Sequence, residues 1–396
     1  MAERFKIQVL NQISQQGLKR LPSELYEISK DCESPDAMLV RSADMHSLQI
    51  ADSVRAIGRA GAGTNNIPVP AMSERGVPVF NAPGANANAV KELVLAGMLM
   101  AARNLPAALR FVGGLDPATQ DMDKFVEDSK KHFAGFELAD HTLGVIGLGK
   151  IGCLVADAAI RLGMNVIGYD PEITVDAAWS LPSQVRKANS VGELLKASHF
   201  VTLHVPLVNA TRGLIGESNI SQMRNGAVLL NFSRDGVADE AVVLEALKSD
   251  KLRYYVCDFP SPQANENPKV IALPHLGAST REAEENCALM VADQLRDYLE
   301  NGNIRNAVNF PETVSPRESG YRLGIANANV PNMLGQISTV LASANLNIHN
   351  MLNRSRGEMA YTIVDVDSAV PAAVIQTLSG IDGVLSVRYL PARDES

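Results

Sequence analysis

Residues 142–170 constrain the fold of this chain more than any other stretch. An apolar run at 142–146 leads into the glycine-rich turn GLGKIG at 147–152, and a helical pattern then extends to Leu162. A second apolar run follows the helix and ends at Asp170. A strand, a glycine turn, a helix and a second strand that ends in an acid are typical of the Rossmann dinucleotide-binding unit. The stretch therefore predicts a βαβ unit that binds a dinucleotide.

Each glycine of the turn has its own function in such a unit. Gly147 permits the tight turn, Gly149 lets a pyrophosphate approach the backbone, and Gly152 lets the helix pack closely on the strand. The N-terminus of the following helix attracts phosphate. The carboxylate of Asp170 can accept hydrogen bonds from both hydroxyls of the adenosine ribose, whereas it would repel a 2′-phosphate. Because the next residues, 171–172, supply no arginine, we predict NAD rather than NADP.

The alternation of strands and helices continues on both sides of this unit. Apolar runs that predict strands lie at 5–10, 37–42, 54–58 and 77–81 before it, and at 199–205, 226–232, 254–259 and 270–273 after it. Helical patterns lie at 86–103, 239–251 and 279–300. A last segment from Tyr321 has the order βαββαβ, which is ferredoxin-like. We therefore expect an α/β protein with a small additional domain at its C-terminus.

The domain boundaries follow from the same patterns. We expect the first part of a substrate-binding domain at 1–95, a dinucleotide-binding domain at 96–280, a return helix at 281–308, a linker at 309–320 and a regulatory domain at 321–396. The linker is rich in proline and polar residues, and the return helix is long enough to carry the chain back to its first domain. The C-terminal unit is small, so a ligand-sensing or pairing function suits it better than catalysis.

The composition argues against several classes of protein. The chain has 396 residues, of which 46% are hydrophobic and 20% charged, so two or three domains with sizeable cores are expected. A net charge of −8 without a basic tract argues against nucleic acid as a partner. The four cysteines form no C-x-x-C pair, which argues against a metal site or a disulfide framework and suits a cytoplasmic setting. Neither a signal peptide nor a membrane-spanning run is recognisable, so we expect a soluble protein without a membrane partner.

Chemistry on a hydroxy acid requires a cation for the carboxylate and an acid/base for the hydroxyl proton. Arg234 follows the strand predicted at 226–232, and a guanidinium can grip a carboxylate bidentately. His275 also follows a predicted strand and is the best acid/base candidate among the seven histidines, because an imidazole titrates near neutral pH. A structural or helix-capping histidine remains the alternative for His275. His204 ends a neighbouring strand, where we expect it to line the cofactor pocket rather than act in catalysis.

Two features of the first domain could meet an anionic substrate. Arg41 lies at the C-terminal end of a predicted strand, where open α/β sheets bind ligands, although a solvated surface arginine is an equal alternative. The loop 61–63 (Gly-Ala-Gly) also follows a strand, but Asn66 occupies the place of the third glycine of a dinucleotide turn. We therefore expect this loop not to bind the cofactor, while its backbone amides could still bind an anion.

Taken together, these residues resemble the D-2-hydroxyacid dehydrogenases, and among them the short forms with a C-terminal ACT domain. The resemblance covers nearly the whole chain, and it is carried by Thr142–Gly152, Val201–Pro206, Asn231–Arg234, Leu273–Thr280 and the βαββαβ tail. It implies a Rossmann NAD-binding domain inserted in a flavodoxin-like substrate domain, followed by a ferredoxin-like ACT domain. It also implies oxidation of 3-phosphoglycerate to 3-phosphohydroxypyruvate with NAD, the entry step of serine synthesis.

The resemblance implies a role for each matching residue. Arg234 would orient the substrate carboxylate, and His275 would take the hydroxyl proton. The cofactor would be held by the backbone of Lys150 and Ile151 and lined by His204, Val205, Pro206, Phe232, Ser233, Asp258, Gly277 and Ala278. The substrate would contact Arg41, Ser42, Gly61, Ala62 and Gly63. In the tail, Asn327, Asn329 and Asn347 match positions that hold an amino acid in related ACT domains, so L-serine is a candidate effector. Pairing of the tails and of the helices at 86–103 suggests a homodimer or homotetramer.

The chain departs from the family pattern in two places, which leave alternatives open. Asp235 intervenes between the arginine and Gly236, where the family has a glycine directly. The glutamate that pairs with the catalytic histidine is missing after Phe259, and Glu266 is the nearest substitute. One alternative is a reductase of hydroxypyruvate, glyoxylate or another 2-keto acid. The other is an NAD-sensing binding protein, such as a corepressor, that has kept the fold without the activity.

Overall fold

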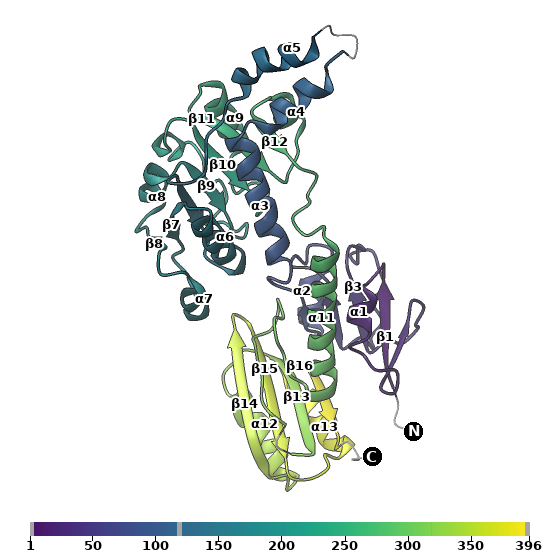
Figure 1. The fold of residues 1–396 in the computed structure, drawn as a ribbon. Coiled ribbons are helices and arrows are strands. Elements are labelled where there is room, and N and C mark those ends of the chain that lie inside the picture. Colours follow the sequence, from purple (N-terminus) through teal and green to yellow (C-terminus); the bar gives the residue numbers. More distant parts are fainter. Residues whose placement is uncertain (1–3, 117–120, 318, 393–396) are drawn as a thin grey trace. The chain divides into compact units, whose positions relative to one another are not determined.

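The computed structural model describes residues 4–116, 121–317 and 319–392 (Figure 1). It divides into two compact units, the first formed by 1–86 with 281–396 and the second by 87–280. The predicted boundary after residue 95 lies inside helix α3 (Ala87–Ala102). This helix belongs entirely to the second unit, because Val94 and Met98 are buried in that unit's core.

The second unit is built on a parallel sheet of seven strands within the described residues, in the order β12-β11-β10-β9-β6-β7-β8. The strands are β6 (Thr142–Ile146), β7 (Asn165–Tyr169), β8 (Arg186–Lys187), β9 (Phe200–Leu203), β10 (Ala227–Asn231), β11 (Leu252–Cys257) and β12 (Val270–Ala272). Its helices, besides α3, are α4 (Leu105–Gly113), α5 (Met122–Ser129), η1 (Lys130–Phe133), α6 (Lys150–Arg161), α7 (Val175–Ser180), α8 (Val191–Ala197), η2 (Ile220–Gln222), α9 (Glu240–Lys248) and α10 (Pro262–Glu266). The strand order reverses at β6, as in Rossmann folds.

The first unit begins with a smaller parallel sheet in the order β2-β1-β3-β4-β5. Its elements are β1 (Phe5–Leu10), α1 (Gln15–Leu18), β2 (Tyr26–Ser29), β3 (Ala37–Val40), β4 (Ala56–Arg59), α2 (Val69–Glu74), β5 (Val79–Phe80) and the long helix α11 (Arg281–Asn301). This strand order is flavodoxin-like. Helix α11 covers the sheet with an apolar face that includes Val291, Leu295 and Leu299, so the returning helix completes the core begun by the first 86 residues.

The C-terminal domain contains an antiparallel sheet in the order β14-β15-β13-β16. Its elements are β13 (Tyr321–Ala328), α12 (Met333–Ser343), β14 (Ile348–Arg356), β15 (Met359–Val366), α13 (Ala372–Ser379) and β16 (Val384–Leu390). The βαββαβ order is the predicted ferredoxin-like one. The three sheets together confirm the predicted fold class.

The C-terminal domain is bound firmly to the end of α11 within the first unit. Arg322 and Asp365 form an ion pair whose side chains are both completely buried, and Arg322 also donates to the carbonyl of Asn301 at 2.9 Å. Arg388 stacks over the ring of Tyr298 at 4.4 Å and donates to the carbonyl of Leu299. Carbonyls at a helix C-terminus lack partners within the helix, and cations there also complement its dipole. The two arginines therefore cap α11 from the C-terminal domain.

The segment predicted as a linker is packed rather than free. Phe310 is completely buried, and Thr313 pairs with Ile304 by backbone hydrogen bonds of 2.8 and 2.9 Å. The side chain of Asn309 accepts a hydrogen bond from the backbone N–H of Val79 at 2.9 Å. Its proline and polar residues predicted a linker, and its polar groups satisfy buried backbone groups.

Among the described residues, no single helix is long and apolar enough to cross a membrane. Helices α3 and α4 would pass together by length and composition, although they are bent by 70° at their junction.

Candidate functional site

The glycine turn after β6 has the geometry that the sequence predicts. Gly147 has φ +91°, and a Cβ there would lie 2.5 Å from the carbonyl oxygen of His204. A Cβ on Gly152 would lie 2.0 Å from the carbonyl oxygen of Gly147. A Cβ on Gly149, by contrast, would meet open space. Gly147 and Gly152 thus allow the close backbone contacts of the turn, whereas Gly149 faces a space that a pyrophosphate could enter. No side chain caps the N-terminus of α6, so its backbone N–H groups remain available to a phosphate.

Asp170 is anchored by its own turn. One carboxylate oxygen accepts the backbone N–H of Leu148 at 2.8 Å, and the other accepts the N–H of Glu172 at 3.0 Å. A carboxylate oxygen has two lone pairs, so each can still accept a ribose hydroxyl. Asp170 lines a cavity of about 450 Å³ whose apolar wall includes Ile173 and Leu181. The cavity suits the adenosine end of a dinucleotide, so these residues fit NAD.

His204 and Val205 lie directly against the glycine turn at Gly147. The Nε2 atom of His204 lies 2.9 Å from the hydroxyl of Thr202, whereas Nδ1 is enclosed without a partner among the described residues. Burial lowers the pKa of His204 to about 3, so the imidazole is neutral at physiological pH. A Cβ on Gly147 would also lie 2.9 Å from Val205. His204 and Val205 thus lie beside the glycine turn, and Pro206 follows directly in the sequence.

Arg234 is held out from the end of β10 by a compact loop. The buried amide of Asn231 donates to the carbonyl of Arg234 at 3.0 Å and accepts from the hydroxyl of Ser233 at 2.9 Å. The exposed guanidinium donates to the carbonyl of Ser233 and has no ion pair within the described residues. Asp235 is occupied locally, since it accepts the N–H of Gly236 at 2.9 Å. The guanidinium is therefore available for an acid. The side chain of Phe232, predicted to line the cofactor, is buried in the core.

His275 stands on a strained turn that Asp258 holds in place. Its φ is +56°, which is uncommon for a residue other than glycine. Asp258 is only 2% exposed, and its two carboxylate oxygens accept the N–H groups of Leu276 and Gly277, each at 2.7 Å. The exposed imidazole meets the ring of Phe259 edge-on, with 5.4 Å between centroids. The sequence suggested Asp258 as a cofactor contact, but its carboxylate instead holds the backbone of this turn. Ala278, the next residue after the turn, is exposed.

The structure does not bring Glu266 to the imidazole of His275. Glu266 is exposed at the last residue of α10 and forms no hydrogen bond or ion pair within the described residues. The reason is local, because Pro262 stands at the first helical position and Ser261 caps the helix by accepting the N–H of Ala264 at 3.0 Å. The segment where a glutamate was expected therefore turns into a short helix.

In the first unit, two of the predicted substrate residues share a cavity of about 480 Å³. It is lined by Arg41 and Ser42 after β3, by Lys30 after β2, and by Asn11 and Gln12 after β1. The carboxyl ends of parallel strands meet at one edge of a sheet, which places these residues together. Lys30 was missed, although its position directly after a strand is the same signal that pointed to Arg41.

Arg41 is not free in this conformation, and the glycine loop lies apart from the cavity. One guanidinium nitrogen of Arg41 lies 2.5 Å from the carboxylate of Glu284 in the first turn of α11. The loop 61–63 follows β4, where the side chain of Asn81 donates to the carbonyl of Ala62. Gly61 and Gly63 do not line the cavity that holds Arg41.

The tail has a cavity of about 260 Å³ beside the start of α12. It is lined by Asn327 and Asn329, as the resemblance implied, together with Asn332 and Asn353. Asn347 lies elsewhere, and its backbone N–H donates to the carboxylate of Asp367 at 3.3 Å. Two of the three predicted asparagines, Asn327 and Asn329, thus line the same cavity, whereas Asn347 does not. The other two lining asparagines were not singled out from the sequence.

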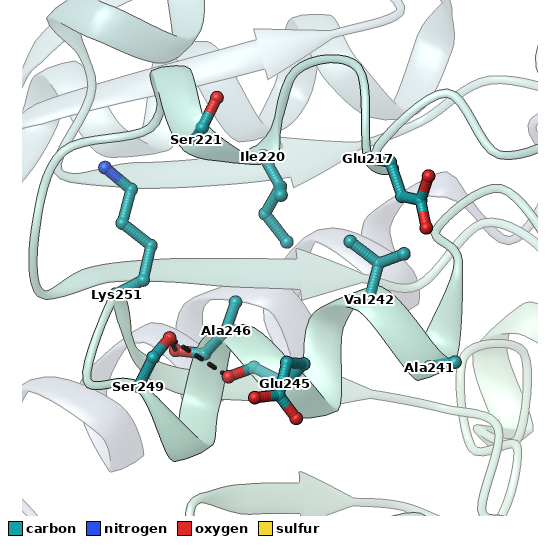
Figure 2. A pocket seen from close by; sticks show the side chains of 9 residues that line it. All are labelled: Glu217, Ile220, Ser221, Ala241, Val242, Glu245, Ala246, Ser249 and Lys251. Carbon is teal, nitrogen blue, oxygen red and sulfur yellow. Dashed lines mark hydrogen bonds between the residues drawn. The ribbon is translucent and has the colours of Figure 1, made fainter.

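A further cavity, of about 610 Å³, contains none of the predicted residues (Figure 2). It lies between η2 and α9, and its floor is made apolar by Ile220, Val242 and Ala246. Figure 2 shows Lys251 at one end and Glu217 at the other. It has glutamates and a lysine, but no histidine, no arginine and no glycine turn, so it does not have the features of a dinucleotide site. Nor do the described residues contain a cluster of histidine, cysteine or acidic side chains that could hold a metal ion.

Residues 95–277 match the model of a family described as D-isomer specific 2-hydroxyacid dehydrogenase, NAD binding domain. The D-3-phosphoglycerate dehydrogenase of Haemophilus influenzae is 33% identical over 355 residues, which cover 87% of this chain and 83% of that protein. The protein of the same name from Methanocaldococcus jannaschii is 40% identical over 297 residues, covering 73% of this chain. The match spans only 54% of the latter protein and 58% of its Archaeoglobus fulgidus counterpart.

Solved structures agree on the architecture. An NAD⁺-bound 3-phosphoglycerate dehydrogenase from Entamoeba histolytica has a TM-score of 0.60 at 25% identity, covering 79% of this chain and all of that one. D-2-hydroxyisocaproate dehydrogenase has a TM-score of 0.63 at 22% identity, covering 77% of this chain and all of that one, which supports the fold alone.

Proposed function

Because this chain belongs to the D-isomer-specific 2-hydroxyacid dehydrogenase family, we propose that it oxidises 3-phosphoglycerate to 3-phosphohydroxypyruvate, the first step of L-serine synthesis. The matched NAD-binding domain confirms the predicted cofactor. The observation that carries the proposal is that two exposed groups follow strands of one unit. They are the guanidinium of Arg234, which has no ion pair within the described residues, and the imidazole of His275 on its anchored turn. The uncommon φ of His275 supports a functional role for this residue, since strained backbone clusters at functional sites.

Each group has a separate task in the proposed reaction. Arg234 binds the substrate carboxylate by charge-assisted hydrogen bonds and so fixes the orientation of C2. His275 accepts the proton of the C2 hydroxyl as the C2 carbonyl forms. Bound NAD would supply the acceptor for the hydride that leaves C2. Asp258 is a positioning residue, since its two hydrogen bonds hold the turn that carries His275. No step requires a metal-bound group, and none is assigned to Glu266.

A phosphorylated substrate needs cations beyond the one that binds its carboxylate. The first-unit cavity supplies Lys30 and Arg41, together with the hydroxyl of Ser42 and two amide side chains. Arg41 is already paired with Glu284, whereas the ammonium of Lys30 forms no ion pair within the described residues and can bind a phosphate in this cavity. We propose Lys30 as the main determinant of preference for 3-phosphoglycerate over D-glycerate.

The function is tested by comparing kcat/KM for 3-phosphoglycerate and D-glycerate with NAD. We expect strong preference for the phosphorylated acid, and Lys30→Ala should reduce it by about 10–100-fold, as for loss of a hydrogen bond to a charged group. D-Glycerate turnover should change little. Lys19→Ala, at the exposed residue directly after α1, serves as a charge-matched control. Turnover of glyoxylate or hydroxypyruvate without 3-phosphoglycerate oxidation would favour the reductase. Absence of turnover with all of these substrates would favour the NAD sensor.

We propose that L-serine inhibits through the cavity beside α12. The cavity is small enough for an amino acid, and its asparagine amides supply donors and acceptors for a zwitterion. Titrating L-serine should lower the rate, and Asn329→Ala should raise the half-inhibitory concentration by about tenfold or more, as for a lost hydrogen bond to a charged group. Asn347→Ala is the matched control, because Asn347 does not line this cavity. A native protein indifferent to serine contradicts the proposal.

We propose that the chain forms at least a dimer through helices α4 and α5. No residue of either helix is buried, and Leu109 of α4 is 70% exposed beside Val112. Exposed apolar side chains that gather on one element mark interaction surfaces. Sedimentation equilibrium should give at least twice the chain mass, and Leu109→Glu with Val112→Glu should halve it. A native protein that sediments as a monomer excludes this interface.

A further inference from the structure

The adenosine end of the NAD site contains two cations that lie far from Asp170 in the sequence. Strand β8 pairs with β7 in parallel, so that Arg186 lies opposite Ile167 and Lys187 opposite Gly168. Both cations line the cavity of about 450 Å³ that Asp170 also lines. The sequence had suggested that no arginine is near Asp170, because Pro171 and Glu172 follow it. The pairing of the two strands corrects that expectation.

The three charges are held differently. Asp170 is fixed by its hydrogen bonds from Leu148 and Glu172, so its negative charge stays at the cavity. Arg186 and Lys187 are exposed, and within the described part of the chain their side chains form no ion pair or hydrogen bond. The acid of the neighbouring helix α8, Glu193, accepts hydrogen bonds from the backbone and side chain of Asn189. These bonds lower the pKa of Glu193, and the nearby charge of Arg186 adds to the effect. Because neither cation is held by a hydrogen bond or an ion pair within the described residues, both side chains can turn toward an anionic ligand.

We propose that Arg186 and Lys187 form a latent site for a 2′-phosphate. With Asp170 present, a 2′-phosphate meets a fixed like charge, and NAD is preferred. If Asp170 is removed, the two cations Arg186 and Lys187 remain at the same cavity. A guanidinium such as that of Arg186 is well suited to bind a phosphate. Exclusion of NADP thus rests on Asp170 alone. A competing explanation is that cations on the edge strand β8 only prevent sheet pairing.

The test measures binding of NADH and NADPH without substrate, so its outcome is independent of the proposed reaction. Energy transfer from Trp179, the single tryptophan, to the reduced nicotinamide supplies the signal. Trp179 is 85% exposed on α7, and the adjacent Ala178 lines the cavity. Native protein should bind NADH at least about tenfold more tightly than NADPH, because a like charge at short range opposes the phosphate.

Two variants separate the contributions of Asp170 and of the two cations. Asp170→Ala should tighten NADPH binding by about tenfold or more through loss of the like charge. Adding Arg186→Ala and Lys187→Ala should then weaken NADPH binding by about fivefold or more, as for loss of hydrogen bonds to a charged group. NADH binding should respond to the added changes by less than about twofold, since the ribose hydroxyls are neutral. The gain for NADPH should also shrink as salt is raised.

Two controls make the result decisive. Lys196→Ala in the Asp170→Ala background removes a cation of α8 that does not line the cavity, and it should leave NADPH affinity unchanged. Asp170→Ser repeats the test if Asp170→Ala does not fold, as judged by its thermal unfolding. The proposal is overturned if native protein binds both cofactors equally, if removing Asp170 gives no gain, or if removing Arg186 and Lys187 costs no NADPH affinity.

Discussion

Replacement of His275 by glutamine is expected to lower kcat for 3-phosphoglycerate oxidation by about 10²–10⁴-fold, the usual contribution of a general base. Glutamine preserves the size and polarity of the side chain but cannot take the hydroxyl proton. The turn should survive, because Asp258 binds the backbone N–H groups of Leu276 and Gly277 rather than the imidazole. NADH affinity should therefore stay within about twofold of the native value, since no cofactor contact is removed.

The pH dependence of kcat/KM identifies the base. A base must be neutral to accept a proton, so activity should fall at acid pH, and His275→Gln should lose this acid limb. Glu266→Gln should leave the profile unchanged, because Glu266 forms no bond to the imidazole. A shifted profile in Glu266→Gln would return that residue to the mechanism. The exposed His132→Gln in η1 is the matched control, and an equally large loss there would reject His275 as the base.

Arg234→Gln is expected to lower kcat/KM for 3-phosphoglycerate by about 10²–10³-fold, comparable to removing a donor aimed at the reacting group. The guanidinium has no ion pair within the described residues, so the change deletes a substrate contact and leaves no acid unpaired. Arg234→Lys should recover only part of the activity, because an ammonium cannot bind a carboxylate bidentately. Steady-state kinetics measure both effects.

The control for Arg234 is an arginine at the opposite end of the same strand. Arg224 precedes β10, is exposed, and should tolerate glutamine with less than about twofold loss of activity, as usual for surface positions. Asn231→Ala provides a positioning test, because its amide organises the loop that presents Arg234. A structural role alone would lower stability without raising KM for the substrate. If Arg234→Gln keeps native kcat/KM, the carboxylate is bound elsewhere.

The parts of the site that were predictable are those that depend on local geometry. The roles of Gly147 and Gly152 follow from backbone contacts within a few residues or with the adjacent strand, and the structure shows those contacts at 2.5 and 2.0 Å from an added Cβ. Arg234 and His275 were found because ligand sites lie after the carboxyl ends of parallel strands. Glu266 became a candidate only because it is the nearest glutamate along the chain. Ser261 and Pro262 are typical of a helix start, and this local indication of a helix was overlooked.

The C-terminal domain shows the same limit of sequence patterns. Proline and polar residues predicted a linker at 309–320, and the pattern gave no sign that the structure buries Phe310 and Thr313 there. The arginines that cap α11, Arg322 and Arg388, carry no sequence signal for this contact, since the groups that they cap on α11 are backbone carbonyls. Backbone groups are present at every position, so a pattern of side chains cannot reveal which of them a distant arginine will meet.

The sequence by itself determined the α/β class, the dinucleotide turn, the preference for NAD and the two candidate catalytic groups. These depend on glycine spacing, strand ends and residue chemistry, all of which are written in short stretches of chain. Only the tertiary structure decided that Lys30 joins Arg41, that Asp258 anchors the turn of His275, and that Arg186 and Lys187 share the cavity of Asp170. Parallel strands bring together residues separated by whole helices, and neither their order in the sheet nor their register can be read from any one of them.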